Sequence, residues 1–273
     1  MSGSEIKPPQ IAPTFQRKPV LSRESVERLM NIGSPLALLI IWEMAAQMHF
    51  IDVRFFPAPS KVFMQLFTMV QNGMLWTHTW ASLQRLFWGF LWGGVPALML
   101  GVAMGMYRTL RVIIEPIVAA TYPIPKSAIL PLILLIFGLG EASKIVMVAT
   151  GVFFPILINS MAGVLEIQKI HFDVSANFGA SKWQVFKTVA LPGALPLIMT
   201  GIKLGVGLGL VLIAIAEMVG AKSGLGYMIW NAWEILSVET MYVGLIVIAV
   251  LGLVLSLILT EVERYVVPWK SQN

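Results

Sequence analysis

Three observations predict that the chain folds as an all-α protein that crosses a membrane several times. Of its 273 residues, 57% are hydrophobic and 12% are charged, whereas soluble domains carry about 25% charged residues. The mean hydropathy is +0.80. Apolar runs near the ~20 residues that span a bilayer as a helix occur six times. We place these six spans at residues 29–48, 83–106, 112–137, 144–165, 194–219 and 241–262.

The polar segment before the first span, residues 1–28, has neither the apolar core nor the cleavage site of a signal peptide. We expect it to be a cytoplasmic tail. Glu43 lies within the first span, where a charge is costly, so we expect it to pair with another group or to face water.

Residues 51–76 follow the first span and contain a helical pattern that is too short to cross the bilayer. Their apolar residues repeat at helical spacing, which predicts an amphipathic helix lying in the membrane interface, with Ser60 as its N-cap. The repeating residues are Val62, Phe63, Leu66, Phe67 and Val70.

Small residues recur every fourth position in the second and fifth spans. Such stripes let helices approach closely in lipid, so we expect them to pack the bundle, with pore lining or a dimer seam as alternatives. The stripes are Gly89, Gly93, Ala97, Gly101 and Gly105, and then Gly201, Gly205 and Gly209.

The third span is interrupted by four prolines, at positions 116, 123, 125 and 131. Proline removes a backbone donor and clashes with the preceding turn, so this span should be kinked or broken. Lys126 lies between Pro125 and Pro131, where it could attract an anionic solute in a translocation pathway. It could instead reach the membrane surface or pair with an acid.

Other charges in or beside the spans are also candidates for the pathway, although each has a structural alternative. Arg85, like Lys203, could extend along its helix to reach the membrane surface. Glu217 could line an outer gate or pair with Lys222. The pathway candidates are Lys126, Pro125, Glu217 and Arg85.

The distribution of basic residues orients the spans. If the N-terminus is cytoplasmic, six spans return the C-terminal tail, residues 263–273, to the same side. Twelve basic residues then lie inside: Lys7, Arg17, Lys18, Arg23, Arg28, Arg108, Arg111, Lys169, Lys182, Lys187, Arg264 and Lys270. Four lie outside: Arg54, Lys61, Lys144 and Lys222. Because basic residues favour the cytoplasmic side, both termini are expected there.

Residues 168–192 form an unusually polar cytoplasmic hairpin between two apolar spans. Gly179 supplies the left-handed position that closes a first short helix. Ser181 and Gln184 fit a capping box that starts a second, and Pro192 with Pro196 should end it. A DNA-binding helix-turn-helix has a similar pattern, but the second helix offers few polar side chains to reach base edges, so no nucleic-acid partner is expected.

The hairpin also resembles the cytoplasmic signature E-A-A-x3-G-x9-I-x-L-P of permease subunits from binding-protein-dependent ABC importers. The matching residues are Asp173, Val174 and Ser175, then Gly179, and then Val189 with Leu191 and Pro192. Val174 departs from the small residue of the signature. Further segments resemble the nitrate, sulfonate and taurine group: FFPAPSKV (55–62), SLQRLFWGF (82–90), PIPKSAILPLILLIFGLGEASKI (123–145), FFPILINSMAGV (153–164) and AEMVGAKSGLGYMI (216–229).

This resemblance implies a methionine-importer-like, type I ABC importer permease fold over residues 29–262, in a bacterial inner membrane. It implies two copies of an ABC ATPase that hold the ATP and Mg, a second permease copy, an extracytoplasmic binding protein and surrounding lipid. The solute would be small and anionic, such as nitrate, a sulfonate or taurine. The implied coupling residues are Asp173, Val174, Ser175, Ala176, Gly179, Ala180, Ser181, Trp183, Phe186, Leu191 and Pro192.

Within the hairpin, Asp173 is expected in or just before the first turn of its helix, where it could cap backbone donors or meet a basic group on the ATPase. Ser175 and Ala176 keep that helix thin. Trp183 and Phe186 are expected either to anchor the hairpin in a partner's groove or to pack on the chain's own spans.

Several classes of site are excluded by what the sequence lacks. It has no cysteine, so disulfides and thiolate metal sites are impossible. Its three histidines show no zinc-ligand spacing. The phosphate loop G-x-x-x-x-G-K-S/T is missing, so the chain itself should bind no cofactor and hydrolyse no ATP. The alternatives are a self-sufficient channel or secondary transporter, which should show inverted repeats, and an intramembrane enzyme, which needs an acid–base or metal cluster.

Overall fold

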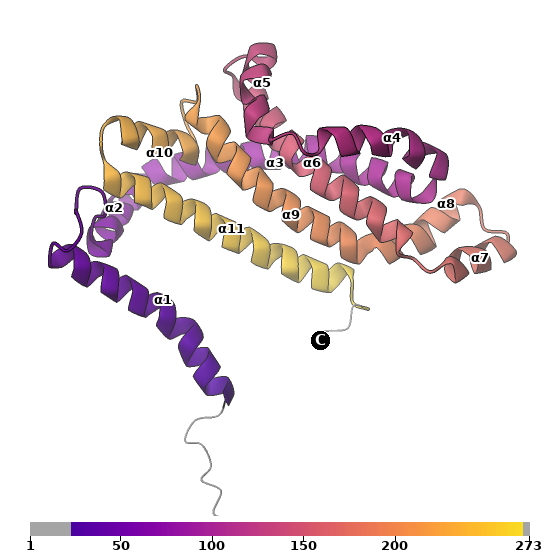
Figure 1. Cartoon of the computed structure of the whole chain (residues 1–273), viewed down its shortest axis with the longest axis horizontal. Coiled ribbons are helices and arrows are strands. Elements are labelled where there is room, and N and C mark those ends of the chain that lie inside the picture. The colour runs from indigo at the N-terminus through magenta and orange to yellow at the C-terminus, as the bar shows by residue number, and fades with distance from the viewer. Residues whose placement is uncertain (1–22, 270–273) are drawn as a thin grey trace, which may run out of the picture.

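Four long helices that run along the long axis of the molecule dominate the structure (Figure 1). They are α3 (Met74–Met106), α6 (Glu141–Leu165), α9 (Leu191–Met218) and α11 (Val238–Val266). The computed structural model describes residues 23–269, and this part of the chain contains helices and no strand. The predicted all-α fold is therefore confirmed. The ends of the two predicted tails lie outside the described residues.

The remaining helices precede or connect these four. They are α1 (Arg23–Gln47), α2 (Pro59–Gln71), α4 (Arg108–Thr121), η1 (Lys126–Ile129), α5 (Leu130–Phe137), α7 (Lys169–Asn177), α8 (Lys182–Val185), η2 (Phe186–Ala190) and α10 (Leu225–Glu234). Helix α1 is as long as α6, with 25 residues each. Among the described residues, four helical stretches are long and apolar enough to cross a membrane, and the bent pair of 108–121 with 126–137 makes a possible fifth. The first predicted span corresponds to α1, which is not in this set, so six spans are consistent with the structure but not all reproduced.

The glycine stripes pack the bundle, as the sequence predicts. A Cβ atom at Gly93 of α3 would overlap the backbone of Ala149 on α6, and one at Gly201 of α9 would meet the backbone of Pro155 on the other side of α6. Helix α6 is therefore held between α3 and α9 at distances that only small residues allow. The apolar core of this three-helix unit includes Leu86, Ala97, Met104, Val148, Val152, Ile156, Leu157, Leu210 and Ile213.

The third predicted span is broken, also as expected. Its two halves, residues 108–121 and 126–137, meet at an angle of 85°, and Pro123 and Pro125 lie in the gap between them. Since proline cannot continue the hydrogen-bonded ladder, the break falls where two prolines are two residues apart. Helix α5 consequently projects from the bundle (Figure 1).

Helix α2 is amphipathic, but its predicted N-cap is wrong. The helix begins one residue before Ser60, at Pro59, and the N-cap residue Ala58 has no side chain that could accept a bond. The carboxylate of Glu43 on α1 replaces it: Glu43 accepts hydrogen bonds from the Ser60 backbone N (2.9 Å) and hydroxyl (2.8 Å). Glu43 is therefore paired, as predicted, and it fastens α1 to the start of α2.

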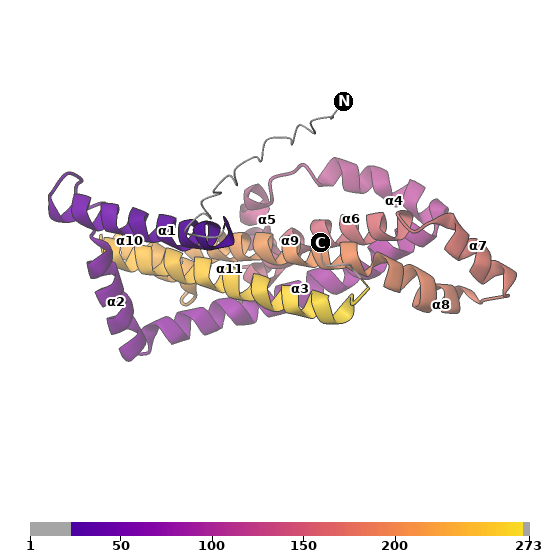
Figure 2. The ribbon, with the colours of Figure 1, turned by 90° about the horizontal axis from the view of Figure 1, so that it is seen from below.

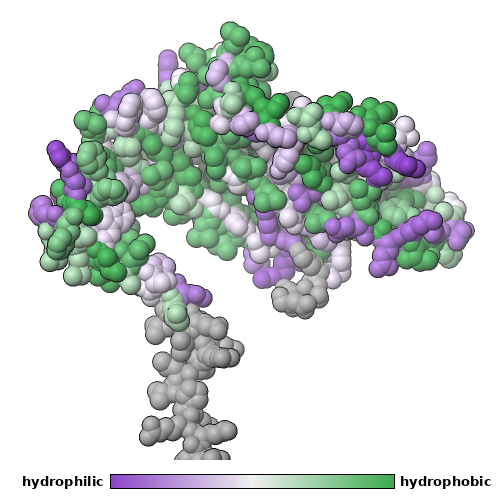
Figure 3. Space-filling view, in the orientation of Figure 1, coloured by the Kyte–Doolittle hydropathy of each residue, from purple (hydrophilic) through white to green (hydrophobic). Residues whose placement is uncertain are grey.

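Polar and apolar surfaces separate along the molecule. Helices α2 and α10 lie at one end of the long axis, and α7 and α8 lie at the other (Figures 1 and 2). Apolar side chains cover most of the face shown in Figure 3, whereas hydrophilic side chains gather over the α7–α8 end, near the turn between α1 and α2, and beside the end of α11. The predicted interfacial segment and the predicted cytoplasmic hairpin thus lie at opposite ends.

Candidate functional site

The hairpin of residues 168–192 forms much as the sequence predicts. Gly179 adopts φ +70° between α7 and α8, the left-handed conformation that glycine tolerates best. Ser181 and Gln184 form the predicted capping box: the Ser181 backbone N donates to Gln184 Oε1 (2.7 Å), and the Gln184 backbone N donates to Ser181 Oγ (3.3 Å). Local sequence alone therefore accounts for the bend.

The end of the second hairpin helix differs from the prediction. Pro192 and Pro196 do not stop it, because helical backbone continues from α8 through η2 into α9. The segment η2 is a π-helix that lies directly before Leu191 and Pro192. Its wider turn accommodates the missing donor and the ring of Pro192. The second helix of the hairpin is thus continuous with α9, and only α7 and the bend at Gly179 stand apart from it.

Asp173 also lies elsewhere than predicted. Helix α7 begins at Lys169 with Gln168 as its N-cap, so Asp173 falls beyond the first turn and cannot cap the first backbone donors. Its side chain is exposed on the surface of the hairpin beside Val174 and Ala176. The Ser175 hydroxyl donates to the Phe172 carbonyl of the same helix (2.8 Å), so its side chain folds back onto α7 and does not project from it.

The two aromatic residues of the hairpin take different positions. Phe186 packs partly buried against the core formed by Val102, Val164 and Ala194. Trp183 stacks on Phe186 with ring centroids 5.1 Å apart, yet it remains 69% exposed. Phe178 at the tip of the hairpin is 88% exposed. An exposed apolar tip on a rigid base suits contact with another protein.

Lys126 lies at the break in the third span. Its Nζ donates to the carbonyls of Thr121 (3.0 Å) and Tyr122 (3.3 Å) at the end of α4, and it lies 4.0 Å from the centroid of the Phe154 ring. The ammonium thus caps a helix C-terminus and makes a cation–π contact. Pro125 is the N-cap of η1 next to it.

Arg85 and Glu217 are brought together inside the bundle. Arg85 is 4% exposed and Glu217 0%, and Arg85 Nη1 donates to Glu217 Oε1 at 2.8 Å. The expectation that Arg85 extends to the membrane surface is therefore wrong, and Glu217 pairs with Arg85 rather than with Lys222. In this conformation neither side chain faces an open channel.

Glu141 and Ser223 complete this cluster, and the sequence reasoning missed both. The Nε and Nη2 atoms of Arg85 donate to the two carboxylate oxygens of Glu141 (2.6 and 2.7 Å). Ser223 accepts from Nη1 through its carbonyl (2.6 Å) and from Nη2 through its hydroxyl (3.1 Å). All five guanidinium N–H groups consequently have an acceptor. The available signal was the polar stripe of His78, Ser82 and Arg85 at i, i+4 and i+7 on one face of an apolar helix.

Two further basic residues are also held by partners. Lys203 on α9 donates to Glu263 on α11 at 2.5 Å, so it does not extend freely to the surface. Lys144, which the topology places in an outside loop, is 1% exposed. It lies in the first turn of α6 and donates to backbone carbonyls of Leu139, Gly140 and Gly220.

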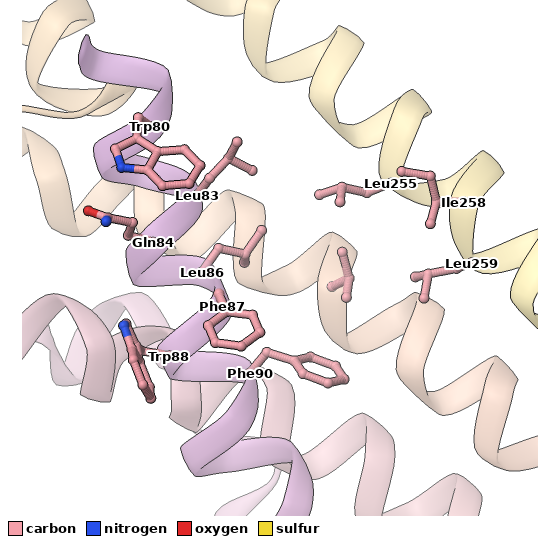
Figure 4. A pocket seen from close by; sticks show the side chains of 11 residues that line it. Trp80, Leu83, Gln84, Leu86, Phe87, Trp88, Phe90, Leu255, Ile258 and Leu259 are labelled. Atoms are coloured by element: carbon pink, nitrogen blue, oxygen red, sulfur yellow. The ribbon is translucent and has the colours of Figure 1, made fainter. Parts of the chain in front are cut away.

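An apolar groove of about 630 Å³ lies between α3, α9 and α11. Figure 4 shows Trp80, Phe87 and Phe90 of α3 on one side and Leu255, Ile258 and Leu259 of α11 on the other. None of the described residues that line the groove is charged, so the groove offers an anion no ionic partner. The described residues also contain no cluster of three or more His, Cys, Asp or Glu that could hold a metal ion.

Comparison with known proteins places the chain among transport proteins. The family of binding-protein-dependent transport system inner membrane components matches residues 97–272. The chain is 35% identical over 248 residues to the taurine transport system permease protein TauC of Escherichia coli, covering 89% of this chain and 90% of that protein. It is 30% identical over 261 residues to a putative aliphatic sulfonates transport permease protein of Bacillus subtilis, covering 95% and 94%.

A similar fold has also been solved experimentally. The structure described as inward facing conformations of the MetNI methionine ABC transporter gives a TM-score of 0.51 at 23% identity. The likeness covers 68% of this chain and 93% of the solved chain. The methionine-importer-like fold expected from the sequence is therefore confirmed.

Proposed function

The chain belongs to the family of binding-protein-dependent transport system inner membrane components, and we propose that it is the permease subunit of an ATP-driven importer of small sulfonates. The observation that carries this proposal is the 35% identity to a taurine permease over nearly the whole of both chains. The aliphatic sulfonate permeases of Bacillus subtilis and Escherichia coli, 30% and 33% identical, support the same class of solute.

The energy for import enters, in this proposal, through the hairpin of residues 168–192. Two such permeases would form a homodimer with a pathway along its two-fold axis, and each hairpin would dock into one ATPase subunit that holds ATP and Mg. An extracytoplasmic binding protein would deliver the solute at the opposite end. The rigid link from α8 through η2 into α9 supports this role, because movement of the hairpin must then move a span.

The contact surface on the hairpin would consist of its exposed residues. Phe178 and Trp183 offer apolar area, and Asp173 offers a charge to a basic group of the ATPase. Between them lie small side chains that let a partner approach the backbone closely: Ser175, Ala176, Gly179, Ala180 and Ser181. Val174 is 45% exposed, and it is a larger side chain than the small residue that the family signature has at this position. Leu191 and Pro192 join the hairpin to α9.

The proposed translocation pathway involves few residues, with Lys126 and Pro125 as the main candidates. Lys126 and Pro125 lie at the break in the third span, and irregular backbone at membrane depth is tolerated mainly beside a cavity or within protein. Lys126 could leave the carbonyls of α4 to meet an anion. Arg85 and Glu217 are the weaker pathway candidates, because they are buried against each other inside the bundle.

Co-purification in mild detergent tests the proposed coupling. An ATPase should purify with the chain in equal amounts and support ATP-dependent uptake in proteoliposomes. Gly179→Pro, which cannot adopt φ +70°, and Asp173→Lys should abolish uptake while the chain still inserts. The matched control is Gly207→Ala, because a Cβ atom there meets nothing within 4 Å. Normal uptake by both hairpin variants would refute docking, and ATP-independent transport would indicate a channel or secondary transporter.

The solute is tested on the partner binding protein. Ligand stabilises a folded protein by mass action, by about 2.7 kcal/mol at a hundred times its dissociation constant. Taurine or an alkanesulfonate should raise the melting temperature of the binding protein more than nitrate does. A larger shift with nitrate would leave the permease role intact and change the solute.

A further inference from the structure

The first turn of helix α10 is hydrogen-bonded to side chains of α3, far away in sequence, and of α9, which directly precedes it. The apolar side chains of α10 also pack on α2 and α11. The backbone N–H of Gly224 donates to His78 Nδ1 (3.1 Å), that of Leu225 to Ser82 Oγ (2.8 Å) and that of Gly226 to Glu217 Oε2 (3.0 Å). The first amides of a helix have no partner within the helix. Here α3 and α9 supply three acceptors in a row.

Arg85 holds these acceptors in place. Glu217 accepts from Ser82 at both carboxylate oxygens (2.9 and 2.8 Å) and from Arg85. Arg85 also binds the carbonyl and hydroxyl of Ser223, directly before the first turn of α10. Because charge-assisted bonds gain strength where water is excluded, this attachment should be stiff. We call His78, Ser82, Arg85, Glu141 and Glu217 the α10 lock.

The charges of the lock are balanced, and its carboxylates differ in their access to solvent. Arg85 and the nearby Lys144 carry two positive charges against the two negative charges of Glu141 and Glu217. The Glu217 side chain is 0% exposed, whereas that of Glu141 is 65% exposed. Glu141 follows Gly138 and Gly140, at both of which a Cβ atom would meet nothing within 4 Å. The Glu141 carboxylate can therefore move from Arg85 into solvent while Glu217 keeps Arg85 paired, whereas release of Glu217 would leave a carboxylate buried without its cation.

Helix α3 connects the lock to the hairpin. Its C-terminal residues Met99, Val102 and Met106 line a pocket together with Trp183 and Phe186, and its N-terminal half carries His78, Ser82 and Arg85. With 33 residues, α3 is about 50 Å long at 1.5 Å per residue. The two ends of the molecule are thus joined by one packed helix.

We propose that Arg85 is a positioning residue that makes α10 move with α3, so that motion at the hairpin is transmitted to the opposite end of the permease. Glu141 is the arm of the lock that releases and re-forms as this end opens and closes. The inference rests on the proposed function, because it assigns the attachment of α10 a part in the transport cycle.

Cysteine labelling tests the lock independently of transport. Because the chain has no native cysteine, only the introduced cysteine can react. Ala232 on α10 is 1% exposed, so Ala232→Cys in the full chain, reconstituted in nanodiscs, should react slowly with a water-soluble maleimide. Arg85→Lys, which keeps the charge but loses the fork, and the uncharged Ser82→Ala should each speed labelling at least about tenfold, because losing a buried charge-assisted bond shifts local opening by this much. Glu141→Gln should speed it less.

Arg54→Gln is the matched control, since Arg54 pairs with Asp52 on the surface and its side chain is 80% exposed. Labelling in this control should equal that of the parent. Unchanged labelling in both Arg85→Lys and Ser82→Ala would refute the attachment of α10 by the lock. If Arg85→Lys does not fold, Ser82→Ala alone provides the test.

The transmission role has a separate readout. Arg85→Lys should lower ATP-driven uptake at least about tenfold while its co-purification with the ATPase is unchanged, and Glu141→Gln should raise ATP hydrolysis in the absence of binding protein. Normal uptake and normal coupling in both variants would overturn the role of the lock in transport. Failure of the parent chain to take up any sulfonate would instead refute the proposed function and leave the labelling result standing.

Discussion

At the residue scale, side chains of similar chemistry differ in how deeply they are buried and in which groups they contact. Trp183 and Phe186 stack on each other, but Phe186 lies against the α3–α9 core whereas Trp183 is 69% exposed. Arg85 and Lys126, both expected near a pathway, are held by carboxylates and by helix-end carbonyls respectively. Substitutions at these positions are therefore expected to affect different properties of the protein.

Trp183→Ala should weaken docking to the ATPase, whereas Phe186→Ala should lower the stability of the permease. Trp183→Ala removes exposed aromatic area and should weaken ATPase binding by about 2 kcal/mol, the scale of an interface hot spot, with an unchanged melting temperature. Phe186→Ala opens a cavity beside α3 and should lower stability by about 2 kcal/mol. Thermal unfolding and binding titration in detergent distinguish the two, and equal effects would contradict this division.

Lys126→Glu tests whether the broken span faces an anionic solute. The substitution reverses the charge in the pathway and places an acid at the C-terminus of α4, which costs about 0.3–1 kcal/mol. Lys126→Gln removes the charge without that penalty, so a loss of uptake in both variants indicates a pathway role. Unchanged uptake kinetics in both would remove Lys126 from the pathway.

At the element scale, the molecule is built from one rigid unit and several attached pieces. Helices α3, α6 and α9 pack through glycine contacts that admit no Cβ atom at Gly93 or Gly201. Helix α5 projects beyond an 85° break. Helix α10 is hydrogen-bonded to α3 and α9 through its first turn and packs on α2 and α11. Rigid spans with separately attached ends are suited to motion between a few discrete arrangements.

Gly93→Ala should separate α3 from α6. The added methyl group overlaps the Ala149 backbone, and overpacking of this kind costs about 1–3 kcal/mol. Its melting temperature in detergent should therefore fall. Gly207→Ala on α9 is the matched control, because it faces open space and exchanges glycine for a better helix former. A similar melting temperature for both variants would show that close approach is unimportant at position 93.

At the scale of the whole molecule, the two ends are chemically different and far apart. The hairpin, with Lys182 and Lys187, occupies one end, and α2 and α10 occupy the other (Figures 1 and 2). The charge distribution predicts that the hairpin end is cytoplasmic, and docking to a soluble ATPase requires it.

Single cysteines can establish this orientation, since the chain has none of its own. Lys222→Cys, in the loop before α10, should react with an impermeant maleimide in intact cells. Lys187→Cys, in η2, should react only after the membrane is permeabilised. Both should react in permeabilised cells, which controls for reactivity, and the reverse pattern would invert the proposed topology.

The sequence by itself determined the features that depend on neighbouring residues. Glycine at position 179, the capping box of Ser181 and Gln184, and the paired prolines 123 and 125 act over one or two turns, so their outcomes follow from local backbone chemistry. The all-α class, the glycine stripes and the family resemblance follow from composition and spacing.

Only the tertiary structure decided where the charges lie. Arg85 meets Glu141 and Glu217 across 56 and 132 residues of sequence, a pairing that no local pattern specifies. The course of the chain past Pro192 and the capping of α2 by Glu43 likewise depend on how helices dock. The physical reason is the same in each case: a buried polar group must find a partner, and which partner comes within reach is settled by packing between distant segments.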